Sequence, residues 1–193
     1  MSYPKAISKE ALNALPVRRF EGEVVLVDSA AHLERALADL HAERVVGWDT
    51  ETRPAFRKGE SYLPSLVQMA TASAVYLFQI QRRDYSRELS AVFASEVLKS
   101  GISVKDDLKQ LRQVIPMEER GVVDAGQIAW RHGMEQTGLR NLAGIFLGFR
   151  VPKGVKTTNW AAPRLTEQQV QYAATDAWAC RELYLKFESL GMT

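Results

Sequence analysis

The sequence predicts a single α/β domain in which a mixed central sheet is flanked by helices. Three observations support this fold class. The chain opens with a strand, a helix and a second strand; its β-rich segments come early and its long helices late; and no internal repeat or linker divides it. With 193 residues, of which 46% are hydrophobic, one such domain can bury a substantial core.

The individual elements follow from the spacing of apolar residues. Residues 23–28 and 43–51 are rich in valine and predict strands, and residues 29–41 between them place Leu33, Ala36, Leu37 and Leu40 on one face of a helix. Two β-rich segments, 65–71 and 75–80, are expected to form a hairpin with the strand before them. Further strands are predicted at 101–105 and 121–124, and helices at 86–98, from Asp106, after Asp124, and from just after Thr166 to about Leu190. Residues 1–20 are polar and proline-punctuated, so we expect an N-terminal arm on a domain spanning 21–193.

The composition excludes several classes of protein. Cys180 is the only cysteine, so an intramolecular disulfide is excluded, and with three histidines a Cys/His zinc cage cannot be assembled. No segment approaches the roughly 18 apolar residues that a membrane span needs, and the N-terminus lacks the apolar core of a secretion signal, which predicts a cytoplasmic protein without a membrane partner. The formal net charge of +2 neither requires nor excludes a polyanionic partner. The sequence does not indicate an oligomeric state.

Two acidic residues lie at the carboxyl end of a predicted buried strand. Asp49 and Glu51 are two residues apart and therefore project from the same face, while Trp48 and Thr50 face the other way. Functional sites concentrate at the carboxyl ends of strands in α/β folds. The alternative is a pair of solvated acids at a strand terminus.

The last helix supplies a third acid. Thr166 and Gln169 fit a capping box that begins it, and a stripe of small and apolar residues predicts the face packed on the sheet: Ala173, Ala177, Cys180, Tyr184 and Phe187. Tyr172 and Asp176 are four residues apart and stack one turn from each other beside this stripe. The alternative is an Asp–Tyr hydrogen bond at the edge of a core helix.

A fourth acid lies in the doubled pair Asp106 and Asp107. Asp107 shares a helix face with Leu111 and Val114, which predicts that it points inward, whereas Asp106 is interpreted as a solvated helix cap. A capping role for Asp107 is the alternative. Four converging carboxylates would repel one another, and hard divalent cations resolve that conflict. Two Mg²⁺ or Mn²⁺ ions bracketing a phosphate favour phosphodiester hydrolysis.

These segments resemble a known family. WDTET around Asp49 and Glu51, GISVKDDLKQL around Asp107, and QYAATDAW around Tyr172 and Asp176 are similar to the three motifs of the DEDD 3′–5′ exonucleases of the tyrosine subclass. RKGESYLPSLVQMAT and NWAAPRLTEQQVQYAATDAWA look most like the exonuclease domain of the Werner syndrome helicase and its stand-alone bacterial relatives, with ribonuclease D more distant. The resemblance covers about residues 18–187.

The resemblance implies a ribonuclease H-like fold with a five-stranded mixed sheet. It implies that Asp49, Glu51 and Asp176 hold one divalent cation, that Asp49 and Asp107 serve a second, and that Tyr172 orients the attacking water. The implied activity is release of nucleoside 5′-monophosphates from a 3′ end, with DNA as the favoured substrate. The alternatives are an RNA-directed enzyme, resembling ribonuclease D or an oligoribonuclease, and an inactive module that binds nucleic-acid ends.

Several residues near these motifs are candidates for contact with nucleic acid. Basic side chains follow the catalytic strand and precede the last helix: Arg53, Arg57 and Lys58, and Arg150, Lys153 and Lys156. Trp48 and Trp160 could stack on bases, but tryptophans beside a buried strand or in a packed loop are more often structural. The alternative for the basic residues is a solvated surface. Asp124 is interpreted as a helix N-cap.

Overall fold

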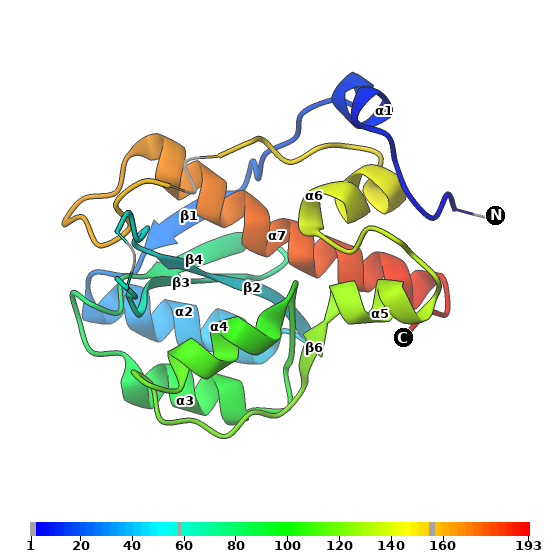
Figure 1. Cartoon of the computed structure of the whole chain (residues 1–193). Helices are drawn as coiled ribbons and strands as arrows, with labels where there is room; N and C mark the ends of the chain where they lie inside the picture. Colours follow the sequence, from blue (N-terminus) through cyan, green and yellow to red (C-terminus); the bar gives the residue numbers. More distant parts are fainter. Residues whose placement is uncertain (1–2, 58, 155–156) are drawn as a thin grey trace.

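The computed structural model describes residues 3–57, 59–154 and 157–193. Six strands form one sheet in the order β1-β4-β3-β2-β5-β6, with helices on both faces (Figure 1). The strands are β1 Glu23–Leu26, β2 Val45–Thr52, β3 Pro64–Ala70, β4 Ala74–Phe78, β5 Leu98–Gly101 and β6 Val122–Asp124. The helices are α1 Lys9–Ala14, α2 Ala30–Ala42, α3 Ser86–Ala94, α4 Val104–Leu111, α5 Ala125–Arg131, α6 Leu139–Leu142, the π-helical turn η1 Ala143–Leu147 and α7 Glu167–Ser189.

The sheet is mixed, as predicted. β3 pairs antiparallel with both β2 and β4, whereas the pairs β1 with β4, β2 with β5 and β5 with β6 are parallel. The parallel strands therefore end at one edge, and β2 lies in the interior of the sheet. The family resemblance implied five strands, and this number is corrected: the sheet has six, with β1 paired to β4 at one edge and β6 paired to β5 at the other.

One stretch of secondary structure differs from the prediction. The strand expected at 101–105 lies earlier, at Leu98–Gly101, and the helix before it ends at Ala94. Ser103 adopts a left-handed conformation with φ of 58°, which breaks the extended chain and lets α4 begin at Val104. Val104 is thus a buried helical residue and not a strand residue. Ile102 and Val104 are apolar and two residues apart, which fits the two-residue period of a strand. Over so short a stretch the same pair also fits the 3.6-residue period of a helix.

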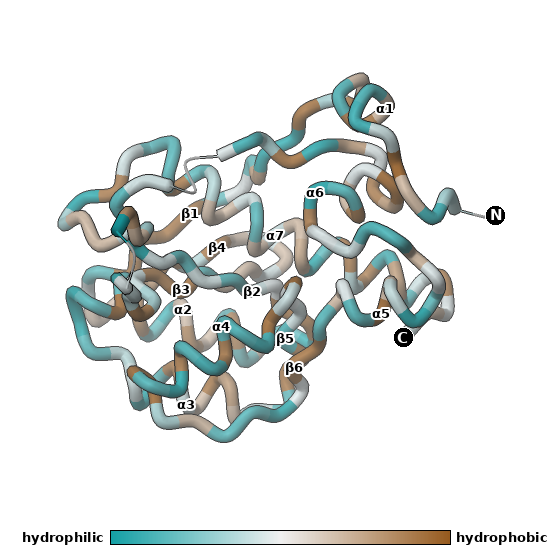
Figure 2. The backbone as a smooth tube through the Cα atoms, viewed as in Figure 1, coloured by the Kyte–Doolittle hydropathy of each residue, from teal (hydrophilic) through white to brown (hydrophobic). Residues whose placement is uncertain are grey.

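The two faces of the sheet are covered by different helices. α2, α3 and α4 pack on one face around Trp48, Met69 and Phe78. On the other face α7 packs on Leu66 and Leu77, with α5 and η1 beside it. Figure 2 shows hydrophobic residues along the central strands and hydrophilic ones on the outer turns of the surrounding helices.

Helix α7 confirms its predicted limits and its predicted inward stripe. The Thr166 side chain accepts from the Gln169 backbone and the Gln169 side chain accepts from the Thr166 backbone, so the capping box is complete. The five stripe residues from Ala173 to Phe187 are all buried. α7 crosses β2, β3 and β5, and it therefore brings its first turns over the carboxyl end of β2.

The N-terminal segment lies along the body of the domain. Its helix α1 buries Leu12, and Val17 forms a parallel bridge with Arg150. The Arg150 guanidinium donates to the Leu15 carbonyl, so this basic residue holds the segment in place. Within the described residues, no helix combines the length and the apolar character needed to cross a bilayer.

Candidate active site

Three acids meet between β2 and α7. Asp49, Glu51 and Asp176 each offer one carboxylate oxygen, and these oxygens lie within 4.8 Å of one another. Glu51 and Asp176 are buried, with 7% and 6% of their surface exposed, and Asp49 is half-buried. Oxygen atoms at this separation can bind a common hard cation, so the group fits Mg²⁺ or Mn²⁺ by the chemistry of its donors.

The backbone explains why the acids converge. Asp49 and Glu51 pair with Gln68 and Leu66 on β3, and alternate residues of a strand share one face, the face that α7 covers. The regular pairing of β2 with β3 shifts just after Glu51, where the strand ends. Asp176 lies on the α7 turn that crosses this end.

Asp107 lies in the same cavity but is held differently. It belongs to α4, which packs on the opposite face of the sheet. The Thr50 hydroxyl donates a hydrogen bond of 2.6 Å to Asp107 Oδ1. Because Thr50 projects away from the side of Asp49 and Glu51, this bond links the fourth acid to β2 around the end of the strand. Asp107 is not part of the three-acid group.

A cavity of about 440 Å³ contains this constellation. Asp49, Glu51, Asp107, Tyr172 and Asp176 all line it. The structure therefore brings together the five residues predicted as catalytic. It also adds residues that the sequence analysis did not select: Thr50, Thr52, Ile102, Ser103, Leu139 and Cys180. Thr50 was detectable as the hydroxyl between two candidate acids, but no sequence pattern points to Leu139.

Tyr172 borders the acids as a neutral phenol. Burial, and after it the negative charges of Asp176 and Glu51, raise the pKa of its hydroxyl far above the usual value. The hydroxyl therefore keeps its proton and can donate a hydrogen bond. Burial also raises the pKa of the Cys180 thiol, which lines the same cavity, so this cysteine is protonated as well.

The prediction that Trp160 stacks on a nucleobase is wrong. Its side chain has no exposed surface, and its ring packs against Tyr172 with centroids 6.1 Å apart. Trp48 is buried as well and meets Phe93 edge-on. Both tryptophans have the structural role that was expected to be the commoner one, because Trp48 is packed in the cluster under α2, α3 and α4 and Trp160 in the cluster under α7.

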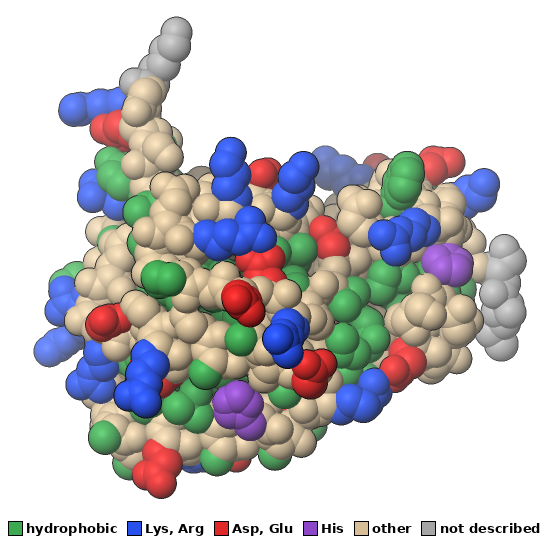
Figure 3. All heavy atoms as spheres, turned by 90° about the horizontal axis from the view of Figure 1, so that it is seen from below, with side chains coloured by type: hydrophobic (Ala, Val, Ile, Leu, Met, Phe, Trp, Pro, Cys, Tyr) green, Lys and Arg blue, Asp and Glu red, His purple; other side chains and the backbone are tan. Residues whose placement is uncertain are grey.

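The basic residues predicted to contact nucleic acid are not part of the acidic cavity where the structure describes them. Arg53, Arg57 and Lys153 are exposed, and none of these three lines the acidic cavity. The Arg53 guanidinium lies over the Tyr62 ring at 4.8 Å from its centroid. Lys58 and Lys156 lie outside the described residues. Figure 3 shows Lys and Arg side chains spread over one face among acidic ones, without a single basic patch.

Two helix starts near the site depend on one acid. Asp124 Oδ1 accepts from the Gly126 and Gln127 amides, which confirms it as the N-cap of α5. Its Oδ2 also accepts from the Val104 amide at the start of α4. Asp106, predicted as a cap, is instead an exposed residue in the first turn of α4, because the helix begins two residues earlier than predicted.

Fold and site together define a ribonuclease H-like protein with a carboxylate centre suited to a divalent cation. The chain belongs to the 3′–5′ exonuclease family, whose family model matches residues 24–191. This confirms the resemblance derived from the motifs.

Known proteins named as exonucleases are similar to this chain in sequence, and a solved EXO domain is similar to it in structure. The exonuclease mut-7 homolog of Aedes aegypti is 28% identical over 87% of this chain, and the mouse bifunctional 3′–5′ exonuclease/ATP-dependent helicase WRN is 27% identical over 93%. The chain spans 27% and 14% of the length of these two relatives. The crystal structure of the Aedes aegypti Nibbler EXO domain superposes with a TM-score of 0.76 at 25% identity, covering 91% of this chain and 92% of that one.

Proposed function

We propose that this chain is a 3′–5′ exonuclease that uses two divalent cations to hydrolyse the terminal phosphodiester bond of nucleic acid. The products are nucleoside 5′-monophosphates. The observation that carries the proposal is the meeting of Asp49, Glu51 and Asp176 at the end of β2, in a chain of the 3′–5′ exonuclease family. The catalytic domain would span residues 21–193, with residues 1–20 as an arm.

The acids would divide the metal-binding work. Asp49, Glu51 and Asp176 would hold one cation directly, and Asp107 would serve a second, with Asp49 shared between the two. Divalent cations bound here would supply Lewis-acid activation of the attacking water and stabilise charge on the leaving oxygen. The all-oxygen donor set favours Mg²⁺ or Mn²⁺ over softer metals.

Tyr172 would orient the attacking water. Its hydroxyl stays protonated beside Asp176, so it can hydrogen-bond to a nucleophile without removing a proton from it. A phenol with a raised pKa is a poor base, and the proposal therefore assigns Tyr172 a positioning contact with the reacting water.

The substrate would be DNA, and the basic side chains would contact its phosphates. Arg53, Arg57 and Lys153 are exposed on the segments that follow β2 and precede α7. Lys58 and Lys156 belong to the same two segments of the sequence. Contacts to phosphate need no particular base, which suits an enzyme that removes every nucleotide in turn. The resemblance to the Werner exonuclease domain favours DNA over RNA.

The test uses 5′-labelled single-stranded DNA, 3′-recessed duplex DNA and matched RNA, each incubated with Mg²⁺, Mn²⁺ or chelator. We expect a ladder that shortens from the unlabelled 3′ end, faster on DNA, and no products with chelator. Faster degradation of RNA than of DNA would contradict the DNA assignment and identify the chain as an RNA exonuclease. Full activity in chelator would contradict the metal mechanism.

Variants make this test specific to the site. Asp176→Asn should abolish hydrolysis while the fold is retained. Asp107→Asn should lower the rate, and Asp106→Asn is its matched control because Asp106 is the adjacent acid and is exposed. Equal losses in the Asp106 and Asp107 variants would reject the role given to Asp107.

A further inference from the structure

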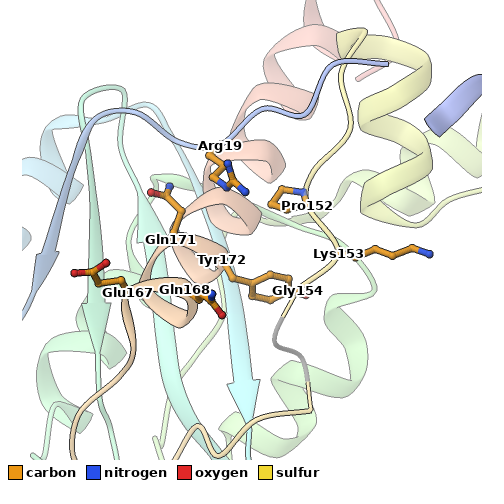
Figure 4. A pocket seen from close by; sticks show the side chains of 8 residues that line it. All are labelled: Arg19, Pro152, Lys153, Gly154, Glu167, Gln168, Gln171 and Tyr172. Atoms are coloured by element: carbon orange, nitrogen blue, oxygen red, sulfur yellow. The ribbon is translucent and has the colours of Figure 1, made fainter. Parts of the chain in front are cut away.

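The ring of Tyr172 lies directly against the backbone of Gly154. A Cβ atom built on Gly154 would lie 1.8 Å from Tyr172 Cδ2 and 1.9 Å from Cε2, well inside van der Waals contact. Figure 4 shows the ring of Tyr172 reaching from α7 to the loop at Gly154. The φ angle of Gly154 is not in the left-handed region, so glycine is required here by space and not by backbone conformation.

The ring of Tyr172 is packed on one side and borders open space elsewhere. Trp160 supports it from within the fold, with ring centroids 6.1 Å apart. Tyr172 also borders a second cavity of about 490 Å³, whose lining includes Arg19 and Gln171 (Figure 4). Tyr172 therefore lines both the acidic cavity and this second one.

We propose that Gly154 is a positioning residue for Tyr172. Its bare backbone lets the Pro152–Gly154 segment lie flat on the ring, which keeps the hydroxyl on the side of Asp176. A side chain at residue 154 would push the ring toward the second cavity or lift the segment away. This inference rests on the proposed function, because it matters for catalysis only if the Tyr172 hydroxyl orients the attacking water.

The size of the expected effect follows from the geometry. A misplacement of about 1 Å in a catalytic group costs on the order of 10²-fold in rate. Gly154→Ala should therefore lower kcat by on the order of 10²-fold. Lys153 and Gly154 are exposed, so the protein should stay folded. Gly138→Ala is the matched control: Gly138 is exposed, and its added Cβ would meet no atom within 4 Å.

A double-mutant cycle with Tyr172→Phe separates this inference from the proposed function. We expect Tyr172→Phe to lower kcat, and Gly154→Ala to add little in that background. If Tyr172→Phe leaves kcat unchanged, the role proposed for Tyr172 fails. If Gly154→Ala costs the same factor in both backgrounds, or costs nothing in the natural one, the positioning role fails while the exonuclease assignment stands.

Stability provides a second readout if Gly154→Ala impairs folding. The clash is with the tyrosine ring, so Tyr172→Ala should make room for the new methyl group. Gly154→Ala should then lower the unfolding temperature less in the Tyr172→Ala background than in the natural protein. An equal loss in both backgrounds would overturn the proposed contact.

Discussion

Gly47 of β2 and Ala177 of α7 lie so close that a Cβ atom on Gly47 would sit 1.9 Å from the Ala177 carbonyl oxygen. The same atom would lie 2.7 Å from the Arg181 amide nitrogen. Asp49 follows Gly47 by two residues, and Asp176 immediately precedes Ala177. The approach of backbone to backbone at this point therefore determines how near the carboxylates of the strand and the helix can come.

Gly47→Ala should move α7 away from β2 and weaken both folding and metal binding. Inserting a methyl group into a packed core costs about 1–3 kcal/mol, and here the neighbours are backbone atoms that cannot rotate away. Urea unfolding and calorimetric titration with Mn²⁺ measure the two effects, with Gly138→Ala as the control. A Gly47→Ala protein of unchanged stability and unchanged Mn²⁺ affinity would refute this account of the close approach.

Thr50→Val should reduce activity through Asp107. The substitution removes the hydroxyl that donates to Asp107 Oδ1 and preserves the shape of the side chain. Hydrogen-bond partners of metal-binding residues are typically worth about 10–100-fold in metal affinity or activity. We expect a loss in that range in kcat at fixed Mg²⁺, and substantial recovery in Thr50→Ser. Equal losses in the serine and valine variants would show that the hydrogen bond is not the cause.

Asp124→Ala should lower the free energy of unfolding by more than the loss of an ordinary helix cap does. Loss of a capping side chain costs about 1–2 kcal/mol, and Asp124 caps α5 while also accepting from the first amide of α4. Urea unfolding measures the free energy, and Asp106→Ala serves as the control since Asp106 is exposed in the first turn of α4. A loss no greater for Asp124→Ala than for Asp106→Ala would contradict the double capping role.

Lys99 should make stability depend on pH in the alkaline range. Its side chain is fully buried, its Nζ donates to the Val92 and Ser95 carbonyls at the end of α3, and burial lowers its pKa from 10.5 to about 8. Between these two values the unfolded chain holds a proton that the folded chain has released. The free energy of unfolding should therefore rise with pH from about 8.

The measurement compares urea unfolding of the natural protein and Lys99→Met between about pH 7.5 and 9.5, below the ordinary pKa of tyrosine. One proton contributes at most about 1.4 kcal/mol per pH unit. The natural protein should show the additional positive slope, and Lys99→Met should lack it. Parallel pH profiles for the two proteins would exclude Lys99 as the source.

Short-range periodicity accounts for what could be predicted of the site. The two-residue spacing of Asp49 and Glu51 and the four-residue spacing of Tyr172 and Asp176 describe neighbours within one element. The prediction failed where a short segment fits two periods, as around Ser103. It also failed at Trp160, where the exposed fraction of the side chain had to be known. The sequence around an aromatic residue in a loop does not show whether its side chain is buried or exposed.

The amino-acid sequence by itself determined the order of the elements, the side of β2 that carries two acids, the inward stripe of α7 and the cap that begins it. Only the tertiary structure decided three contacts between elements. Thr50 donates a hydrogen bond to Asp107, the backbone of α7 packs closely against Gly47, and Gly154 lies against the ring of Tyr172. The physical reason is that the spacing of residues along the sequence fixes only which side chains share a face of the same helix or strand. Contacts between elements depend instead on how distant side chains fill the space between them.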